Sequence, residues 1–516
     1  MTALPKAKTL SDDEVSALGS QKSLVEYFGI EGLYGYRSIS LESPYAATIL
    51  IAKNGSGKST LLGALDAFLK CQFFRLQGLQ FDKIRCRLRG LEEELTLTKS
   101  DIDSLADVSS DSELARYSRL AEIDVTTLRR FIAEDFPVLR GDHTSLNEDK
   151  VFNALWKITN YNYSEAVNIC QRLLSNLYSD TPTLFNLQRS IKEVLKDIEI
   201  VYLPTFRRVE LPLQSDRGRS RKARLRFSQS SSLYGSDIQF GLSDIHERLA
   251  DLNQTILSES NIGYRQISAN IINELIDGTF ERDDFSSNNL PDRESLELFF
   301  SRLKEGGRRI GPYHDVVIPN IEKIYGGEEL DFVSRKTLRY FLGKLYTVIN
   351  STRDIELRVE EFISICNNYL AGPDDSATPR KERHPKVKSQ RADGKVLRLT
   401  RRNLKVHAES VASERKIPLD SLSSGEKQMV SLFAKLYLYE KNKIVLIDEP
   451  ELSMSLNWQR QILPDVISAP LCQQVIAITH SPFIFDNALE PYAKSLTLSL
   501  DLESLSPVGL DDDEIA

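Results

Sequence analysis

Apolar and polar positions alternate most clearly in the first hundred residues. Residues 24–42 alternate around a Gly-Tyr turn, which predicts a β-hairpin. Residues 47–52 form a short run that is apolar except for Thr48 and predicts a buried strand. After a loop rich in glycine and serine, residues 59–69 carry apolar side chains at helical spacing, and residues 80–99 predict two more strands. This region therefore predicts a strand, a glycine loop and a helix in succession.

The middle of the chain has a mostly helical pattern. Residues 113–200 contain amphipathic stripes, and residues 198–203 form an apolar run that predicts a strand. Residues 236–370 again favour helices, with breaks at paired glycines. Residues 371–394 are polar and contain prolines, which is typical of an exposed loop or linker.

The C-terminal region returns to strands. Residues 395–418 alternate like a hairpin, and residues 424–440 have the pattern of an amphipathic helix. Two short apolar runs, 444–447 and 475–478, predict buried strands. The chain as a whole therefore predicts an α/β protein with a long helical stretch between its strand-rich ends.

Composition excludes several classes of protein. The chain has 516 residues, of which 41% are hydrophobic and 27% charged, as in folded soluble proteins of several domains. Its apolar runs are shorter than the roughly 18–20 residues that span a bilayer, and its start lacks the apolar segment of a signal peptide. The five cysteines form no CxxC pair, which argues against disulfides and structural zinc. We expect a cytoplasmic protein without a membrane partner.

The net charge is −8, yet two stretches are basic. Residues 207–226 contain eight Lys or Arg and two acids, and residues 380–405 contain eleven and two. Each stretch is either a solvated loop or a patch that follows nucleic-acid phosphates, and for one stretch alone the loop is favoured.

A glycine loop follows the first buried strand. Residues 52–60 read AKNGSGKST and match the end of the P-loop pattern G-x-x-x-x-G-K-[ST], although Ala52 replaces its first glycine. The glycines let backbone N–H groups surround phosphate oxygens at the start of a helix. The lysine reaches the β- and γ-phosphates, and the first hydroxyl after it ligates Mg²⁺. The predicted nucleotide-binding residues here are Asn54, Gly55, Ser56, Gly57, Lys58, Ser59 and Thr60, with Ser59 also a metal ligand.

Two carboxylates follow the strand at 444–447, in the sequence IVLIDEP. An acidic turn after a strand is common, so this pattern is weak by itself. Together with the glycine loop it predicts that Asp448 binds the nucleotide and its Mg²⁺, and that Glu449 is the general base.

Two further segments are candidates for phosphate contacts. The sequence LSSGEKQ opens the helix at 424–440, and its residues Ser423, Ser424 and Gly425 offer hydroxyl and N–H groups at a positive helix end. His480, in ITHSP, follows the last buried strand and predicts a sensor of the γ-phosphate. Taken separately, these segments are an ordinary N-cap and a half-buried histidine.

The order of these motifs resembles that of the ABC ATPases, in the SMC/RecF/OLD-like branch rather than the transporter branch, and LSSGEKQ and DEPELSMSL carry that likeness. The resemblance implies an ABC-type P-loop ATPase core, with a mixed sheet flanked by helices and a large, mostly helical insertion. It implies ATP and Mg²⁺ as ligands. It also implies that Ser423 and Gly425 contact the γ-phosphate held by an opposite subunit, in a homodimer or higher oligomer.

The chain departs from this family in two places. Ser455 stands about where relatives carry a histidine after the DEPE segment, and Ala52 replaces a glycine, so we expect slow hydrolysis. A scaffold that binds ATP without turnover stays open. The family's Q-loop glutamine is expected near 72–80, where Gln77 and Gln80 are both candidates.

A shorter likeness lies inside the insertion. The segments VYLPTFRRVE (201–210) and QFGLSDIHERL (239–249) resemble the PtuA ATPases of Septu and retron-associated antiviral defence. That resemblance implies a bacterial cytoplasmic protein with an HNH nuclease partner and, in retron systems, a reverse transcriptase with its DNA–RNA product. Arg207 and Arg208 then contact nucleotide phosphate or nucleic acid, or they form a salt-bridged pair at a domain junction.

The spacing of the motifs predicts the domain organisation. Lys58 and Ser423 lie 365 residues apart, more than one ATPase lobe needs. Only 36 residues follow His480 and the histidines are dispersed, so we expect no nuclease site in the chain itself. The expected parts are the N-terminal core (1–100), a helical insertion (101–197), a core strand with a basic segment (198–250), a second helical insertion (251–394) and the C-terminal core (395–516).

The predicted function is that of an ATPase that dimerises around nucleotide and regulates a separate effector in antiviral defence. The alternative is a DNA-repair or recombination ATPase of RecF/SMC type that clamps DNA against the stretches 207–226 and 380–405.

Overall fold

The computed structural model describes most of the chain, namely residues 10–53, 55–104, 112–139, 146–147, 149–204, 242–277, 290–308, 319–325, 331–371 and 394–500. Contacts divide the chain into two compact units. We call the first the sheet unit (Leu10–Gln239 and Lys441–Ala516) and the second the helical unit (Met1–Thr9 and Phe240–Glu440).

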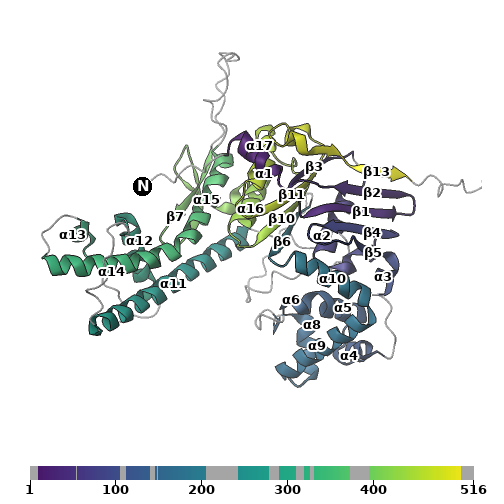
Figure 1. Cartoon of the computed structure of the whole chain (residues 1–516), viewed down its shortest axis with the longest axis horizontal. Coiled ribbons are helices and arrows are strands. Elements are labelled where there is room, and N and C mark those ends of the chain that lie inside the picture. Colours follow the sequence, from purple (N-terminus) through teal and green to yellow (C-terminus); the bar gives the residue numbers. More distant parts are fainter. Residues whose placement is uncertain are drawn as a thin grey trace, which may run out of the picture. The chain divides into compact units, whose positions relative to one another are not determined.

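A parallel sheet forms the centre of the sheet unit (Figure 1). Its strand order is β12 (Ala493–Ser495), β3 (Ala47–Ile51), β11 (Cys472–Thr479), β10 (Asn442–Asp448) and β6 (Ile198–Leu203), and all neighbouring strands are parallel. Because the carboxyl ends of parallel strands meet at one edge, the loops after β3, β10 and β11 converge. These loops carry the glycine loop, the two carboxylates and His480.

An antiparallel sheet lies beside it in the same unit. Its order is β13 (Thr497–Leu500), β2 (Arg37–Glu42), β1 (Val25–Leu33), β4 (Lys83–Leu88) and β5 (Leu95–Thr98). The predicted hairpin and the two strands at 80–99 are thereby confirmed. The expected α/β class is also confirmed, although the described strands of this unit form one antiparallel and one parallel sheet rather than a single mixed sheet.

The core of the sheet unit forms around α2 (Lys58–Leu69), which is buried along nearly its whole length. The Phe68 ring of this helix packs edge-on against Phe28 of β1, with ring centroids 5.8 Å apart. Gln474 of β11 is fully buried, and its amide accepts from the Val25 N–H at 2.8 Å and donates to the Val25 carbonyl at 2.9 Å. This side chain therefore ties the parallel sheet to the antiparallel one.

The rest of the sheet unit is helical, as predicted for 113–200. The apolar side chains between Leu114 and Leu177 form a separate core, whereas those of α10 (Pro182–Val194) join the core around α2. The helix α10 contacts both β5 and α9, which joins this helical part to the sheets. The elements are α1 (Asp12–Gly19), η1 (Phe73–Leu76), α3 (Lys99–Ser104), α4 (Glu113–Ala121), α5 (Val125–Arg130), the π turn η2 (Phe131–Asp135), α6 (Phe136–Leu139), α8 (Lys150–Ile158), α9 (Tyr163–Asp180), α10 (Pro182–Val194), α17 (Leu456–Ile467), η7 (Pro482–Ile484) and η8 (Glu490–Tyr492).

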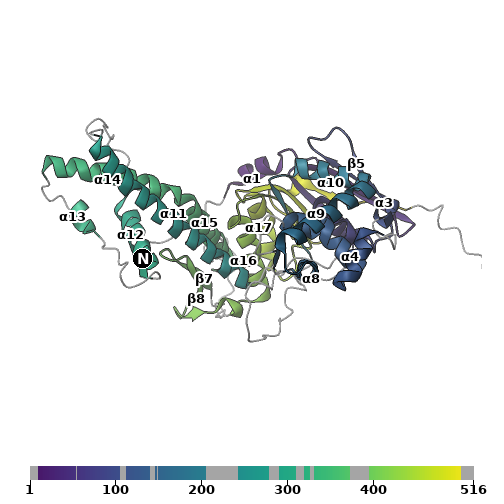
Figure 2. The same ribbon diagram turned by 90° about the horizontal axis from the view of Figure 1, so that it is seen from below.

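The helical unit contains α11 (Leu242–Ile276), α12 (Arg293–Arg308), α13 (Ile321–Tyr325), α14 (Phe332–Ser351), α15 (Arg353–Leu370) and α16 (Ser424–Tyr437). The helices α11 and α14 run side by side (Figure 2). Their backbones come close at Gly263, where an added Cβ would lie 2.7 Å from Cγ1 of Val348. Glycine is needed there because any larger side chain would push the helices apart.

A small antiparallel sheet links α15 to α16 within this unit. It contains β7 (Lys395–Thr400), β8 (Lys405–Ser410) and β9 (Lys416–Ile417), followed by the turn η6 (Leu419–Ser421). The side chain of Asn367 on α15 bonds both the N–H and the carbonyl of Leu397, at 2.7 and 3.1 Å. The rings of Tyr369 on α15 and Phe433 on α16 lie 5.4 Å apart. The helix α16, which begins within LSSGEKQ, therefore packs inside the helical unit.

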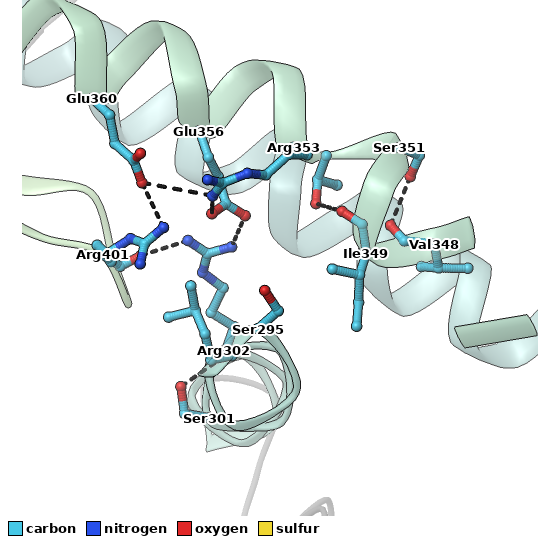
Figure 3. Close-up of polar contacts among 12 residues, drawn as sticks. Ser295, Ser301, Arg302, Val348, Ile349, Ser351, Arg353, Glu356, Glu360 and Arg401 are labelled. Atoms are coloured by element: carbon cyan, nitrogen blue, oxygen red, sulfur yellow. Dashed lines mark hydrogen bonds and ion pairs between the residues drawn. The ribbon is translucent and has the colours of Figure 1, made fainter. Parts of the chain in front are cut away.

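A buried network of charges holds α12, α15 and the β7–β8 turn together (Figure 3). The Arg302 guanidinium on α12 bonds the Glu356 carboxylate at 2.5 Å and the Arg401 carbonyl at 2.6 Å. The Arg401 guanidinium pairs with Glu360 at 2.6 Å, and Arg353 lies within 3.4–3.7 Å of both carboxylates. Arg302, Glu356 and Glu360 are all less than 10% exposed. Such a network requires every member, because removing one charge leaves another buried without its partner.

Some expectations fall at the limits of the described chain. The predicted helix at 424–440 ends at Tyr437, and of the predicted linker at 371–394 only the two end residues are described. Among the described residues, no helix is long and apolar enough to cross a bilayer. The five-part domain division stays a prediction.

Candidate nucleotide-binding site

The glycine loop starts α2 with backbone angles that suit glycine. Gly55 and Gly57 have φ of 81° and 89°, and Gly57 is the N-cap of α2. Ala52 is not among the described non-glycine residues with positive φ, and its N–H donates to the Thr479 carbonyl at 3.2 Å. Alanine at this position therefore requires no strained backbone. Asn54 lies outside the described residues.

The glycine loop and the two carboxylates come together, as the sequence predicts. Lys58 Nζ lies 2.9 Å from Glu449 Oε1, with the lysine 6% and the glutamate 19% exposed. The Ser59 hydroxyl donates to Asp448, which is fully buried at the end of β10. These residues are 389 and 391 positions apart in sequence, and the order of the parallel strands places them at one edge. Thr60 is buried in the first turn of α2, whereas Ser56 is half-buried in the loop before it.

Glu449 has an unusual backbone conformation. Its φ is 52°, in the left-handed region, and its N–H donates to the Ile478 carbonyl at 2.8 Å. Such a conformation costs a non-glycine residue about 1–3 kcal/mol and persists where the surroundings hold it. Four residues on, Ser453 has φ of 62°. The loop after β10 is therefore held in a strained shape that aims the Glu449 carboxylate at Lys58.

His480 follows β11 and is held by Glu451, a residue that the sequence analysis did not select. His480 Nδ1 lies 2.9 Å from Glu451 Oε1 and 4.0 Å from Glu449 Oε1. The Glu451 side chain is 6% exposed, whereas that of His480 is 48% exposed. The available signal was the third acid of DEPE, two positions after Glu449, but nothing in the pattern named its partner.

Arg37 is a second residue that the sequence did not reveal. Its guanidinium donates to the Gly55 carbonyl at 3.2 Å and lies over the Tyr34 and Tyr36 rings, 5.2 and 5.4 Å from their centroids. A cation over an aromatic face is favourable by about 0.5–1 kcal/mol at exposed sites. The turn of the first hairpin therefore supports the glycine loop.

The glutamines near 72–80 stay unassigned. The Gln77 carbonyl accepts from Lys99 Nζ at 2.7 Å, and the Gln80 carbonyl accepts from the Tyr34 N–H at 3.0 Å. Both contacts involve the backbone, so they do not separate the two candidates.

The LSSGEKQ segment forms a complete capping box. Ser423 is the N-cap of α16: its Oγ accepts from the Glu426 N–H at 3.3 Å, and its own N–H donates to Glu426 Oε2 at 2.7 Å. Lys395 Nζ lies 2.7 Å from the same carboxylate oxygen. Burial would raise the pKa of Glu426, but the hydrogen bonds from Lys395 and Ser423 hold it below its ordinary value. Ser424 is exposed and Gly425 is buried in the first turn.

Ser423, Ser424 and Gly425 belong to the helical unit. Lys58, Asp448, Glu449 and His480 belong to the sheet unit. Contact of Ser423 and Gly425 with a γ-phosphate therefore stays a prediction. The segment 207–226, with Arg207 and Arg208, lies outside the described residues, and of 380–405 only 394–405 is described.

The oxygen atoms beside Lys58 suit magnesium. The Ser59 hydroxyl and the Asp448 carboxylate are adjacent hard donors, which is the set that Mg²⁺ takes alongside phosphate oxygens. The described residues contain no cluster of three or more His, Cys, Asp or Glu side chains that could hold a metal. A metal held by the Ser59 and Asp448 oxygen atoms would complete its coordination with phosphate oxygens.

Comparison with known families identifies the class of protein. A family described as "AAA domain, putative AbiEii toxin, Type IV TA system" matches residues 209–486, more than half of the chain. The chain belongs to this family, and it is a P-loop ATPase of the ABC/AAA-like type. The matched range includes Ser423, Asp448, Glu449 and His480 and begins after the glycine loop. A search of curated proteins finds no match.

Proposed function

We propose that the chain binds and slowly hydrolyses ATP, dimerises around two nucleotides and thereby regulates a separate effector in antiviral defence. The observation that supports it most directly is the pairing of Lys58 with Glu449 beside the Ser59–Asp448 contact. A P-loop lysine and a carboxylate at a strand end are the groups that position phosphate and attacking water.

The Lys58–Glu449 pair suggests how binding and chemistry are coupled. Phosphate oxygens compete with Glu449 for the single ammonium group of Lys58. When Lys58 turns to the phosphates, Glu449 is released and its carboxylate accepts a proton from the attacking water. Mg²⁺, when bound, neutralises charge that develops on the phosphate oxygens. His480 contacts the γ-phosphate from the end of β11.

Dimer formation supplies the regulatory step of this proposal. Ser423 and Gly425 of a second copy contact the γ-phosphate, so ATP favours the closed pair and hydrolysis relaxes it. The Lys395–Glu426 pair connects the small sheet to this serine turn, which gives the helical unit a route for transmitting closure. By resemblance, the effector is an HNH nuclease, accompanied in retron systems by a reverse transcriptase and its DNA–RNA product.

Three variants test this proposal: Lys58→Ala, Ser423→Arg and Glu449→Gln. Each is assayed for phosphate release and for its oligomeric state with and without ATP. Protection against phage is measured in cells that also carry the genes adjacent to its own. Lys58→Ala should abolish ATP-dependent pairing, and Ser423→Arg should block pairing while leaving ATP binding. Exposed Lys157→Ala on α8 is the matched control. Pairing and protection unchanged in both Lys58→Ala and Ser423→Arg would refute the proposal.

A second candidate function, a DNA clamp, is favoured by the outer face of the small sheet. Arg398 lies directly opposite His407 across β7 and β8, and Lys416 lies opposite Glu409 across β8 and β9. Burial, followed by the nearby Lys416 charge, lowers the pKa of His407 despite the closeness of Glu409. Lys405 and Lys416 are exposed on this face. Its charge is therefore positive and suits phosphate backbones.

Salt-dependent DNA binding separates the two candidates. A DNA clamp predicts duplex affinity that falls steeply with salt, and a shallower salt slope in Arg398→Glu/Lys405→Glu/Lys416→Glu. Normal phage protection by this triple variant would favour effector regulation without DNA contact at this face. Absent or salt-insensitive DNA binding by the unchanged chain would count against the clamp.

A further inference from the structure

The buried carboxylate of Glu451 has three donors around it. Its Oε2 accepts from the Thr479 hydroxyl at 2.7 Å, and its Oε1 accepts from the His480 backbone N–H at 3.0 Å. The third donor is His480 Nδ1, 2.9 Å from Oε1. Two of these contacts hold the chain at the end of β11, and the third reaches the imidazole itself.

The contact at Nδ1 fixes that this nitrogen carries a proton and in which direction Nε2 points. A carboxylate only accepts hydrogen bonds, so Nδ1 must carry the proton, and the other ring nitrogen, Nε2, is turned away from Glu451. The same logic applies when a carboxylate orients a metal-bound or catalytic histidine. Because the His480 side chain is 48% exposed, packing alone does not hold the ring.

The backbone of Glu451 is anchored as well. Gln459 of α17 donates to the Glu451 carbonyl at 3.4 Å, and the Ser481 hydroxyl donates to Gln459 Oε1 at 2.8 Å. Glu451 therefore lies in a set of bonds that joins the loop after β10, the start of α17 and the end of β11.

We propose that Glu451 is a positioning residue for His480: it accepts from Nδ1–H and aims Nε2 at the γ-phosphate of bound ATP, to which Nε2 donates when both ring nitrogens carry a proton. This inference rests on the proposed function, in which His480 contacts that phosphate. Glu451 itself does not touch the nucleotide. Its effect on hydrolysis therefore passes entirely through the imidazole.

The test compares Glu451→Ala, His480→Ala and the double variant in steady-state ATP hydrolysis, expressed per folded molecule. Loss of an orienting carboxylate typically lowers activity about 10- to 100-fold. We expect a fall of that size in kcat for Glu451→Ala with little change in KM for ATP. We expect the double variant to be no slower than His480→Ala, because the two residues act as one unit.

A matched control separates positioning from folding. Thr479→Ser removes a buried methyl group beside Glu451 but keeps the hydroxyl that donates to the carboxylate, so kcat should stay near that of the unchanged chain. Nitrogen-15 NMR of labelled histidine supplies an independent readout, since the Nδ1-protonated form of His480 should be lost in Glu451→Ala.

The outcomes distinguish this inference from the function on which it rests. If His480→Ala hydrolyses ATP normally, the proposed role of His480 is wrong. If His480→Ala is slow while folded Glu451→Ala keeps normal kcat, or if the two effects multiply in the double variant, Glu451 is structural and the inference is overturned.

Discussion

Two clusters of opposite charges in this protein are similarly buried but differently built. In the sheet unit, Lys58 offers one ammonium group to Glu449. In the helical unit, Arg302 bonds Glu356 and the Arg401 carbonyl through two guanidinium nitrogens, and Arg401 bonds Glu360 and Glu294 through two of its own. A lysine is a single mobile charge, whereas an arginine fork is fixed in direction by its several bonds.

The difference separates an ion pair that can exchange partners from a network that cannot. Glu449 is held in a strained backbone, and Lys58 has a ready alternative partner in phosphate, so this pair can open during a reaction cycle. The Arg302 network has no comparable alternative, because its two carboxylates are buried and each is paired with arginine. We therefore expect changes at Lys58 and Glu449 to alter activity, and changes at Arg302 to alter stability.

The largest expected effect is on catalysis in the sheet unit. Glu449→Gln removes the general base and should lower ATP hydrolysis about 10²- to 10⁴-fold. Because the amide no longer attracts Lys58 as a charge, ATP affinity should be unchanged or tighter. Phosphate release and equilibrium nucleotide binding measure the two quantities. Equally fast hydrolysis in Glu449→Gln and the unchanged chain would exclude Glu449 as the base.

The next effect is on stability in the helical unit. Arg302→Ala leaves Glu356 buried without its principal partner and should lower the free energy of unfolding by about 3–5 kcal/mol. Urea denaturation monitored by circular dichroism measures the loss. The exposed Arg293→Ala, which removes a surface ion pair on the same helix, should change stability by less than about 1 kcal/mol. Similar losses in the two variants would show that the network does not behave as a buried unit.

The carboxylate of Glu134 extends the comparison, because burial raises its pKa more than the neighbouring positive charges lower it. Glu134, in the π turn, accepts from the Phe74 N–H at 3.1 Å, and burial raises its pKa to about 7. The folded state then binds a proton that the unfolded state releases, so stability should fall as pH rises from about 4.5 to 7. The slope is at most about 1.4 kcal/mol per pH unit.

Glu134→Gln should remove this part of the pH dependence. Unfolding free energies of both proteins at pH 5, 6 and 7 test it, with the difference between them growing towards pH 7. Parallel pH profiles would show that Glu134 is ionised normally in the fold.

The smallest expected effect concerns the serine turn. The pKa of Glu426 is lowered in the fold, so its contribution to stability is present above its ordinary pKa and is lost as pH falls through the folded value. Lys395→Met should weaken the capping box by about 1 kcal/mol near neutral pH and reduce the loss of stability below about pH 4.5. Thermal unfolding between pH 3 and 7 measures both changes. An unchanged acid profile would show that Lys395 does not support this turn.

Local sequence patterns were sufficient to predict the helices and strands of the candidate site and the chemical groups at their ends. The strand before the glycine loop, α2, β10 and β11 follow from runs of apolar residues whose period depends only on neighbours in sequence. The sequence likewise selects Lys58, Ser59, Asp448 and Glu449, because phosphate and metal chemistry restricts which residue types can follow such strands. The structure brings these four together.

Only the tertiary structure showed which residues contact one another. Arg37 belongs to no motif, and the DEPE motif that contains Glu451 does not name its partner. The roles of these two residues appear only when the first hairpin lies beside the glycine loop and the end of β11 lies beside the loop after β10. Arg302 and Glu356 are 54 positions apart, and neither differs in the sequence from a surface charge. The physical reason is that periodicity reports which face of an element is buried, whereas the partner of a buried charge depends on which distant element covers that face.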